Sequence, residues 1–174
     1  MDVEGAVSGL VRAVAKSELS KLPSKMAEKF VSDGWRIVIT EKDIASTYTA
    51  EGEYEAGTVF GLIIYADKII YIQNTLLKDY DNELYTSALH EMGHWFDVML
   101  SYDGGHYTSY QDEFDALYQE EKATYVEAFG SNATDTNNEF FAQCFYRYFT
   151  EGEALEETCP GIKAWFDDAL SEYL

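Results

Sequence analysis

Residues 88–101 have the sequence Ala-Leu-His-Glu-Met-Gly-His-Trp-Phe-Asp-Val-Met-Leu-Ser, and this stretch decides the interpretation of the whole chain. When each residue is turned by roughly 100° on a helical wheel, the apolar side chains share one wide face, and His90 and His94 lie on the opposite, polar face. The pattern predicts a helix over about residues 82–101, with Asp81 as its N-cap. The apolar face consists of Leu84, Ala88, Leu89, Met92, Trp95, Phe96, Met99 and Leu100.

The two histidines belong to the pattern His-Glu-x-x-His, formed by His90, Glu91 and His94. Because residues four apart project from the same face of a helix, two imidazoles at this spacing can bind one zinc ion. Glu91 lies one step further round the helix, where its carboxylate can act as a general base on a zinc-bound water. Gly93 is favoured at a helix position that another backbone approaches, and Asp97 is placed to orient a ligand histidine. The alternative interpretation is two solvated histidines on a polar helix face.

A catalytic zinc ion takes three protein ligands and keeps one position for water, so a third ligand is needed. One alternative is His106, which follows a glycine-rich loop, and the other is a carboxylate. Glu139 stands out among the carboxylates because it begins a segment, residues 137–149, with a broad apolar helix face. Glu139 lies opposite that face, together with Gln143 and Tyr146. A glutamate at a helix N-terminus is also favoured by the helix dipole alone.

The segments His-Glu-Met-Gly-His-Trp-Phe-Asp (90–97) and Asn-Glu-Phe-Phe-Ala-Gln-Cys-Phe (138–145) resemble the catalytic domain of anthrax lethal factor and its smaller secreted relatives, the Pro-Pro endopeptidases. In that family a helix beginning with a zinc-ligand glutamate follows the second histidine by some 45 residues. Glu139 follows His94 by 45 residues. The resemblance implies a zincin-like metalloendopeptidase in which His90, His94 and Glu139 bind Zn²⁺ and Glu91 is the general base.

Two positions depart from the family pattern. The family has an acidic residue four positions after the ligand glutamate, where this chain has Gln143. It also has a catalytic tyrosine about seven positions before that glutamate, where this chain has Asn132. If residues 130–136 are an insertion, Tyr125 occupies the place of that tyrosine, and we expect it to stabilise the oxyanion. The alternatives for this role are Tyr107, Tyr110, Tyr146 and His106.

The rest of the chain predicts an α+β fold in a single catalytic domain, residues 1–174. Helical spacing predicts two helices within residues 1–34, separated by Pro23, and the β-branched run 35–40 predicts a strand. Residues 58–73 predict a hairpin that turns at residues 66–68, so that residues 35–80 hold a small mixed sheet. Residues 81–174 are expected to be helical. Further helices are predicted over about 111–127 and 138–149, and from Pro160 onward.

We expect a peptide substrate to bind as an added strand along the edge of the hairpin at residues 58–73. Gly57 and Gly61 would let the substrate backbone come close to that edge. A plain core hairpin is the alternative interpretation of the same pattern.

The net charge is −20, and the acidic residues are unevenly distributed. Residues 1–42 carry seven basic and six acidic side chains, whereas residues 43–174 carry five basic and 26 acidic side chains. Such a surface repels phosphate, so we expect neither nucleic acid nor an anionic membrane as a partner. The acidity favours solubility or the steering of a cationic peptide. We expect a monomer that acts on a protein or peptide substrate.

No apolar run is long enough to span a membrane, and the first residues lack the pattern of a signal peptide. The family resemblance implies a secreted protein whose signal has been removed, whereas a sequence that is complete as encoded implies a cytoplasmic one. Cys144 and Cys159 allow one disulfide or two free thiols.

Two other classes of protein fit the same motifs. One is the intracellular His-Glu-x-x-His peptidase of a mobile element, which cleaves a repressor. The other is an interaction domain that keeps the zinc helix but has weak catalysis, as Asn132 and Gln143 suggest.

Overall fold

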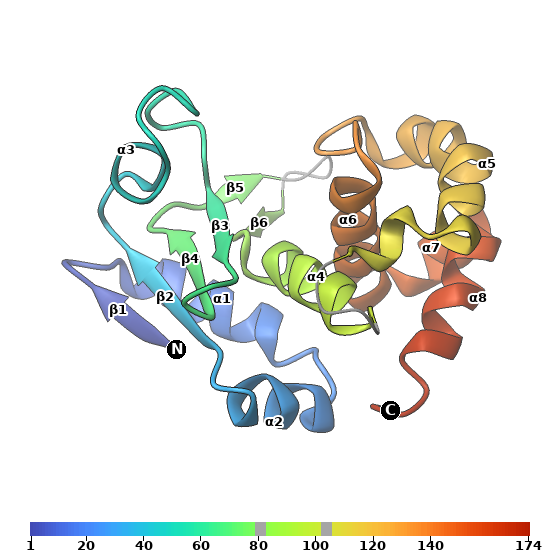
Figure 1. Ribbon diagram of the computed structural model, residues 1–174, viewed down its shortest axis with the longest axis horizontal. Helices are drawn as coiled ribbons and strands as arrows, with labels where there is room; N and C mark the ends of the chain where they lie inside the picture. The colour runs from blue at the N-terminus through green and yellow to red at the C-terminus, as the bar shows by residue number, and fades with distance from the viewer. Residues whose placement is uncertain (79–82, 102–105) are drawn as a thin grey trace. The chain divides into compact units, whose positions relative to one another are not determined.

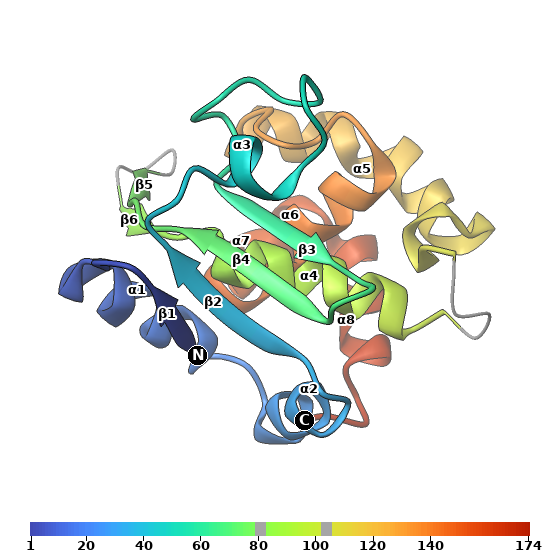
Figure 2. The same cartoon turned by 60° about the vertical axis from the view of Figure 1, so that its left-hand side comes forward.

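A four-stranded mixed sheet is the centre of the N-terminal part of the chain (Figures 1 and 2). The computed structural model describes residues 1–78, 83–101 and 106–174. The chain divides into two compact units, Met1–Glu91 and Met92–Leu174. The boundary falls inside helix α4 (Ala88–Met99), which runs continuously through it.

The sheet has the strand order β1-β2-β4-β3, which places β3 at one edge (Figure 2). The β-branched run forms β2 and pairs in parallel with β1 and β4, whereas β3 and β4 pair antiparallel. The predicted strand and hairpin are therefore confirmed, and Lys68 turns the hairpin with a φ of 54°. The strands are β1 (Asp2–Glu4), β2 (Arg36–Thr40), β3 (Gly61–Ile64) and β4 (Ile69–Gln73).

Strand β1 was not expected, because the sequence predicts only helices before Gly34. Its three residues, Asp-Val-Glu, are short and mostly polar, and only their parallel pairing with β2 makes them a strand. The two predicted helices follow it and are separated at Pro23 as expected. They are α1 (Gly9–Leu19) and α2 (Ser24–Ser32), and a short helix, α3 (Ile44–Tyr48), follows β2.

Helix α4 begins later than its apolar pattern predicts. Leu84 and Tyr85 fit the helical periodicity, but they form strand β6 (Leu84–Tyr85), which pairs with β5 (Leu77–Lys78). The backbone N–H of Ala88 donates to Thr86 Oγ1 at 3.2 Å, which satisfies a donor at the start of the helix. The expected N-cap, Asp81, and the glycines of the expected loop at 103–105 lie outside the described residues.

The second unit is helical and has an aromatic core. Phe114 and Phe141 lie 4.9 Å apart between ring centroids, and Phe166 lies 5.0 Å from Phe141. The predicted helices are confirmed, including the one that begins at Pro160, whereas α7 was not expected. After α4, the helices are η1 (Thr108–Tyr110, a 3₁₀ helix), α5 (Asp112–Phe129), α6 (Asn137–Thr150), α7 (Gly152–Thr158) and α8 (Pro160–Ala169).

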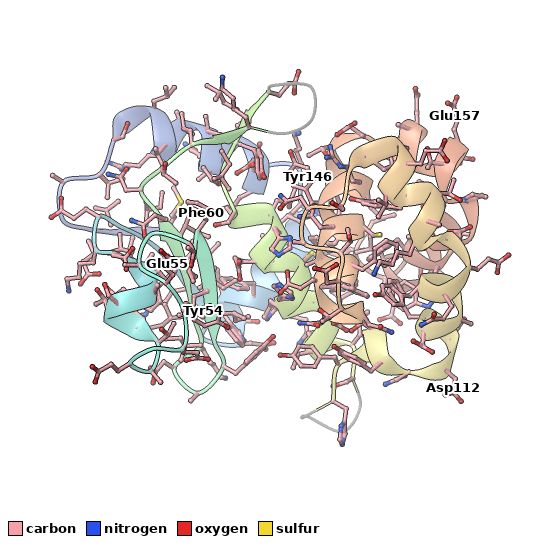
Figure 3. All side chains as sticks on the ribbon, turned by 90° about the horizontal axis from the view of Figure 1, so that it is seen from above. Tyr54, Glu55, Phe60, Asp112, Tyr146 and Glu157 are labelled. Carbon is pink, nitrogen blue, oxygen red and sulfur yellow. The ribbon has the colours of Figure 1, made fainter. Side chains whose placement is uncertain are left out.

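Many acidic residues lie on the outer faces of these helices. Asp112 at the start of α5 and Glu157 near the end of α7 are exposed examples (Figure 3). Among the described residues, no helix has the length and apolar character that crossing a membrane requires.

The first unit also contains a buried acid, Glu18 of α1, which is 6% exposed. Its carboxylate accepts hydrogen bonds from the backbone N–H of Thr86, at 3.1 Å, and from the Thr86 hydroxyl. Burial raises the pKa of Glu18 to about 7, although the bonds from Thr86 oppose this shift. Glu18 therefore joins α1 to the segment that leads into α4.

We predict that Glu18→Gln removes part of the pH dependence of stability. Because the folded protein holds the proton of Glu18 more tightly than the unfolded chain does, stability falls as pH rises from about 4.5 to about 7. Glu18 accounts for roughly 3 kcal/mol of the loss in the wild type, so the loss should be smaller by about that amount in the variant, in which Asp97 still contributes. Urea unfolding at pH 4.5 and pH 8 measures it. The control is Glu28→Gln at an exposed position, whose change in stability between the two pH values should match that of the wild type. If Glu18→Gln also matched the wild type, the raised pKa of Glu18 would be contradicted.

Candidate metal centre

Three of the predicted site residues lie together. His90 and His94 are one turn apart on α4, and Glu139 is in the first turn of α6. One ligand atom from each of the three lies within 4.8 Å of the other two. His94 Nε2 and Glu139 Oε1 are 3.4 Å apart. The chain thus brings two imidazoles and one carboxylate to one place, whereas His106 is not part of this group.

The spacing of this group fits a zinc ion. Ligand atoms about 2.1 Å from a tetrahedral zinc lie about 3.4 Å from one another. The distance from His94 to Glu139 already has this value. Because no pair in the group exceeds 4.8 Å, a small side-chain movement brings the third atom to the same spacing. Two imidazoles and a carboxylate also form a common donor set for catalytic zinc.

The close packing of α4 on α6 explains how Glu139 reaches His94. A Cβ atom at Gly93 would lie 2.8 Å from Ala142 Cα and 3.1 Å from Phe145 Cβ, so only glycine fits there. One turn further along α4, the ring of Phe96 packs against Phe145 at 5.5 Å between centroids. The expectation that Gly93 admits another backbone is confirmed.

Glu91 lies beside the beginning of strand β3. Its side chain is 6% exposed, and a Cβ atom at Gly61 would overlap its carboxylate and lie 2.6 Å from Ser87 Oγ. The Ser87 hydroxyl donates to the backbone carbonyl of Phe60 at 2.6 Å (Phe60 is labelled in Figure 3). The residue that precedes α4 is therefore bonded to the residue that precedes the edge strand, and the Glu91 carboxylate lies against Gly61.

Asp97 is bonded to Ser109 of η1. Its two carboxylate oxygens accept hydrogen bonds from the backbone N–H and the hydroxyl of Ser109, both at 2.7 Å. It is completely buried, and burial raises its pKa to about 6 against the opposing effects of the Ser109 bonds and of His94. Asp97 thus anchors η1 to α4, and its charge also interacts with His94.

Tyr125 lies in the aromatic core of the second unit. It is 2% exposed, its ring lies 5.1 Å from that of Phe140, and its hydroxyl is hydrogen-bonded with Arg147. Burial raises the pKa of this phenol well above its usual value. The structure therefore places Tyr125 among core residues, with its hydroxyl beside Arg147. Its sequence position resembled that of a catalytic tyrosine, but helix α5 turns it toward the core.

The other candidates for an oxyanion donor differ in their exposure. Tyr110 is 54% exposed, and its hydroxyl donates to Asn138 Oδ1 at 2.9 Å, next to Glu139. Tyr146 is 6% exposed on α6 (Figure 3), with the guanidinium of Arg147 5.2 Å from its ring. Tyr107 is half-buried and His106 is exposed.

Comparisons with known proteins show similarity at the level of fold. No protein-family model matches the sequence, and no curated protein matches it. Among solved structures, the chain is similar to the Pro-Pro endopeptidase PPEP-2 from Paenibacillus alvei. The TM-score is 0.69, the match covers 96% of each chain, and the sequence identity is 19%. The α+β fold class is therefore confirmed, and at this identity the likeness concerns the fold alone.

We predict that Gly93→Ala destabilises the protein and weakens zinc binding. The added methyl group gains up to about 1 kcal/mol of helix propensity but meets the Ala142 backbone, and such overpacking costs about 1–3 kcal/mol. Urea unfolding and chelator competition measure both effects. Gly152→Ala is the matched control in the same unit, because its Cβ would meet nothing closer than 3.9 Å. Zinc binding as tight as in the wild type would show that the helix spacing does not set the metal site.

Proposed function

We propose that this chain is a zinc-dependent endopeptidase that hydrolyses peptide bonds in a protein or peptide substrate. The observation that carries the proposal is the group of His90, His94 and Glu139, with Glu91 on the same helix. The fold similarity to PPEP-2 supports the same class of reaction. When bound by these three residues, zinc would activate water and polarise the carbonyl of the scissile bond.

Glu91 is proposed as the general base. Its carboxylate takes a proton from the attacking water and then delivers that proton to the leaving amine. Two features suit it to this role. It is nearly buried, which strengthens its electrostatic interactions, and its position is confined by Gly61 and the first turn of α4. A confined base needs little reorganisation during the reaction.

The substrate is proposed to bind as an extended strand along β3. This strand lies at the edge of the sheet, and its other side pairs with β4. An extended peptide adds to such an edge through main-chain hydrogen bonds. Because Gly61 is both the first residue of β3 and the neighbour of the Glu91 carboxylate, a peptide on this edge passes the base.

The sequence of the substrate is proposed from two features. The name of the similar structure specifies a Pro-Pro bond, so peptides with this bond are the first to test. The net charge of −20 favours peptides with basic residues around the scissile bond. We further infer that the protein is secreted, as the sequence resemblance implies.

We expect the purified protein to bind one zinc ion and Glu91→Gln to reduce kcat by about 10²–10⁴-fold, because the variant has no base. Metal analysis and a peptide library that contains Pro-Pro bonds measure both. Exposed Glu127→Gln is the control and should keep wild-type kcat. A protein without zinc would disprove the proposal. Zinc binding without cleavage of any peptide would instead support an interaction domain.

We expect Gly61→Ala to reduce kcat by about 10–100-fold while stability changes little. The methyl group would overlap the end of the Glu91 side chain and displace its carboxylate, and small misplacements of a catalytic group are costly. Steady-state kinetics and urea unfolding measure the two effects. The control is Ser87→Ala, because the Ser87 hydroxyl is the other group that a methyl at position 61 would meet. This variant should keep kcat within a few-fold of the wild type. A rise in KM alone would show that Gly61 serves substrate binding and not the base.

A further inference from the structure

A buried hydrogen-bond network joins α4, η1 and the beginning of α6. Its centre is Ser109, whose N–H and hydroxyl donate to Asp97 of α4, both at 2.7 Å. The carbonyl oxygen of Ser109 accepts a bond from Asn137 Nδ2 at 3.0 Å. Ser109 and Asp97 have no exposed surface, and Asn137 is 7% exposed. One residue therefore binds both helices through three of its polar groups.

The two ends of this network lie next to proposed zinc ligands. Asp97 follows His94 by three residues on α4, and Asn137 precedes Glu139 by two residues in the first turn of α6. Asn137 is further fixed by a bond from its Nδ2 to Asp115 Oδ1 at 2.7 Å. A displacement of Asn137 would thus carry Glu139 with it, because both belong to the same rigid helical turn.

The neighbouring residue of the 3₁₀ helix makes a second link to α6. The hydroxyl of Tyr110 donates to Asn138 Oδ1 at 2.9 Å, and the Thr136 hydroxyl donates to the same oxygen at 2.7 Å. Asn138 in the first turn of α6 is therefore bonded both to Tyr110 of η1 and to Thr136, which precedes the helix. The links are at the end of α6 that carries Glu139.

The hydrogen bonds of Ser109 add direction to the packing contacts between α4 and α6. The contacts of Gly93 with Ala142 and of Phe96 with Phe145 set how closely α4 and α6 approach, but apolar packing of this kind fixes the angle between two helices less strictly than directed bonds do. Glu139 lies three residues from Ala142, so a small rotation moves its carboxylate away from His94. Hydrogen bonds depend on direction, and those of Ser109 restrict this angle further.

We infer that Ser109 and Asn137 are positioning residues for the metal centre, which hold Glu139 at the distance from His94 that zinc requires. This inference rests on the proposed zinc site. Residues that orient metal ligands typically change metal affinity by 10–100-fold when they are replaced. A positioning role differs from a role in folding. If Ser109 and Asn137 position the ligands, their replacement weakens zinc binding while the protein remains folded.

The test is the zinc affinity of the folded protein, measured by competition with a chelator well below the unfolding temperature. Asn137→Ala should raise the Kd for zinc by about 10–100-fold, because it loses both the bond to Ser109 and the bond to Asp115. Ser109→Ala loses one bond to Asp97 and should raise the Kd less, by several-fold. It also serves as the test variant if Asn137→Ala does not fold.

Glu121→Ala provides a matched control in the same unit. Glu121 accepts bonds from the backbone N–H groups of Gly161 and Ile162 at 2.8 and 2.9 Å and so caps α8, with no bond to the Ser109 network. It should lower the urea midpoint but leave the Kd for zinc within about twofold of the wild type.

The outcomes separate this inference from the proposed function. If the wild type binds no zinc, the proposed metal centre itself is wrong. If the wild type binds zinc and both Asn137→Ala and Ser109→Ala bind it as tightly, the metal centre stands and the positioning role is wrong. If Glu121→Ala weakens binding as much as Asn137→Ala does, the effect is one of general stability, and the inference is again wrong.

Discussion

The contact between the backbones of α4 and α6 at Gly93 and Ala142 is the constraint on which the candidate site depends. Helices usually pack 8–10 Å apart, and the approach is closest where side chains are smallest. Here glycine faces alanine, and the methyl group of a second alanine would already be too close. This approach allows the Glu139 carboxylate on one helix to lie 3.4 Å from His94 on the other. The geometry of the candidate site therefore depends on the absence of a Cβ atom at Gly93.

Much of this arrangement is predictable from the sequence because it depends on local patterns. The β-branched run of β2 and the turn at Lys68 specify their own conformations, and the apolar face of α4 specifies which side is buried. The same periodicity misplaced the start of α4, because Leu84 and Tyr85 fit a helix as well as they fit a strand. Only their pairing with β5 decides between helix and strand, and the sequence around these two residues does not indicate that pairing. Strand β1 was missed for the same reason.

At the site, the sequence predicts the histidines, Glu91 and Glu139 but not their supports. Asp97 is bonded to Ser109, a residue with no distinguishing pattern around it, so the sequence does not predict this bond. Tyr125 was chosen by its distance along the chain from Glu139, yet its direction depends on how α5 packs, and it lies in the core. Residue type and spacing thus identify the residues of the candidate site, whereas the partners of those residues depend on contacts between distant segments.

The open edge of β3 has a consequence for the protein in concentrated solution. A strand at a sheet edge can pair with the same strand of another copy as readily as with a peptide, and such pairing leads to aggregation. Natural proteins commonly protect edges with charge. In this chain each copy carries a net charge of −20, and two copies that approach edge to edge repel each other over about a Debye length, ~10 Å at 0.1 M salt. If β3 binds a substrate as proposed, the acidity protects this edge without closing it, because the charge repels another copy of the chain but does not repel a neutral or basic peptide.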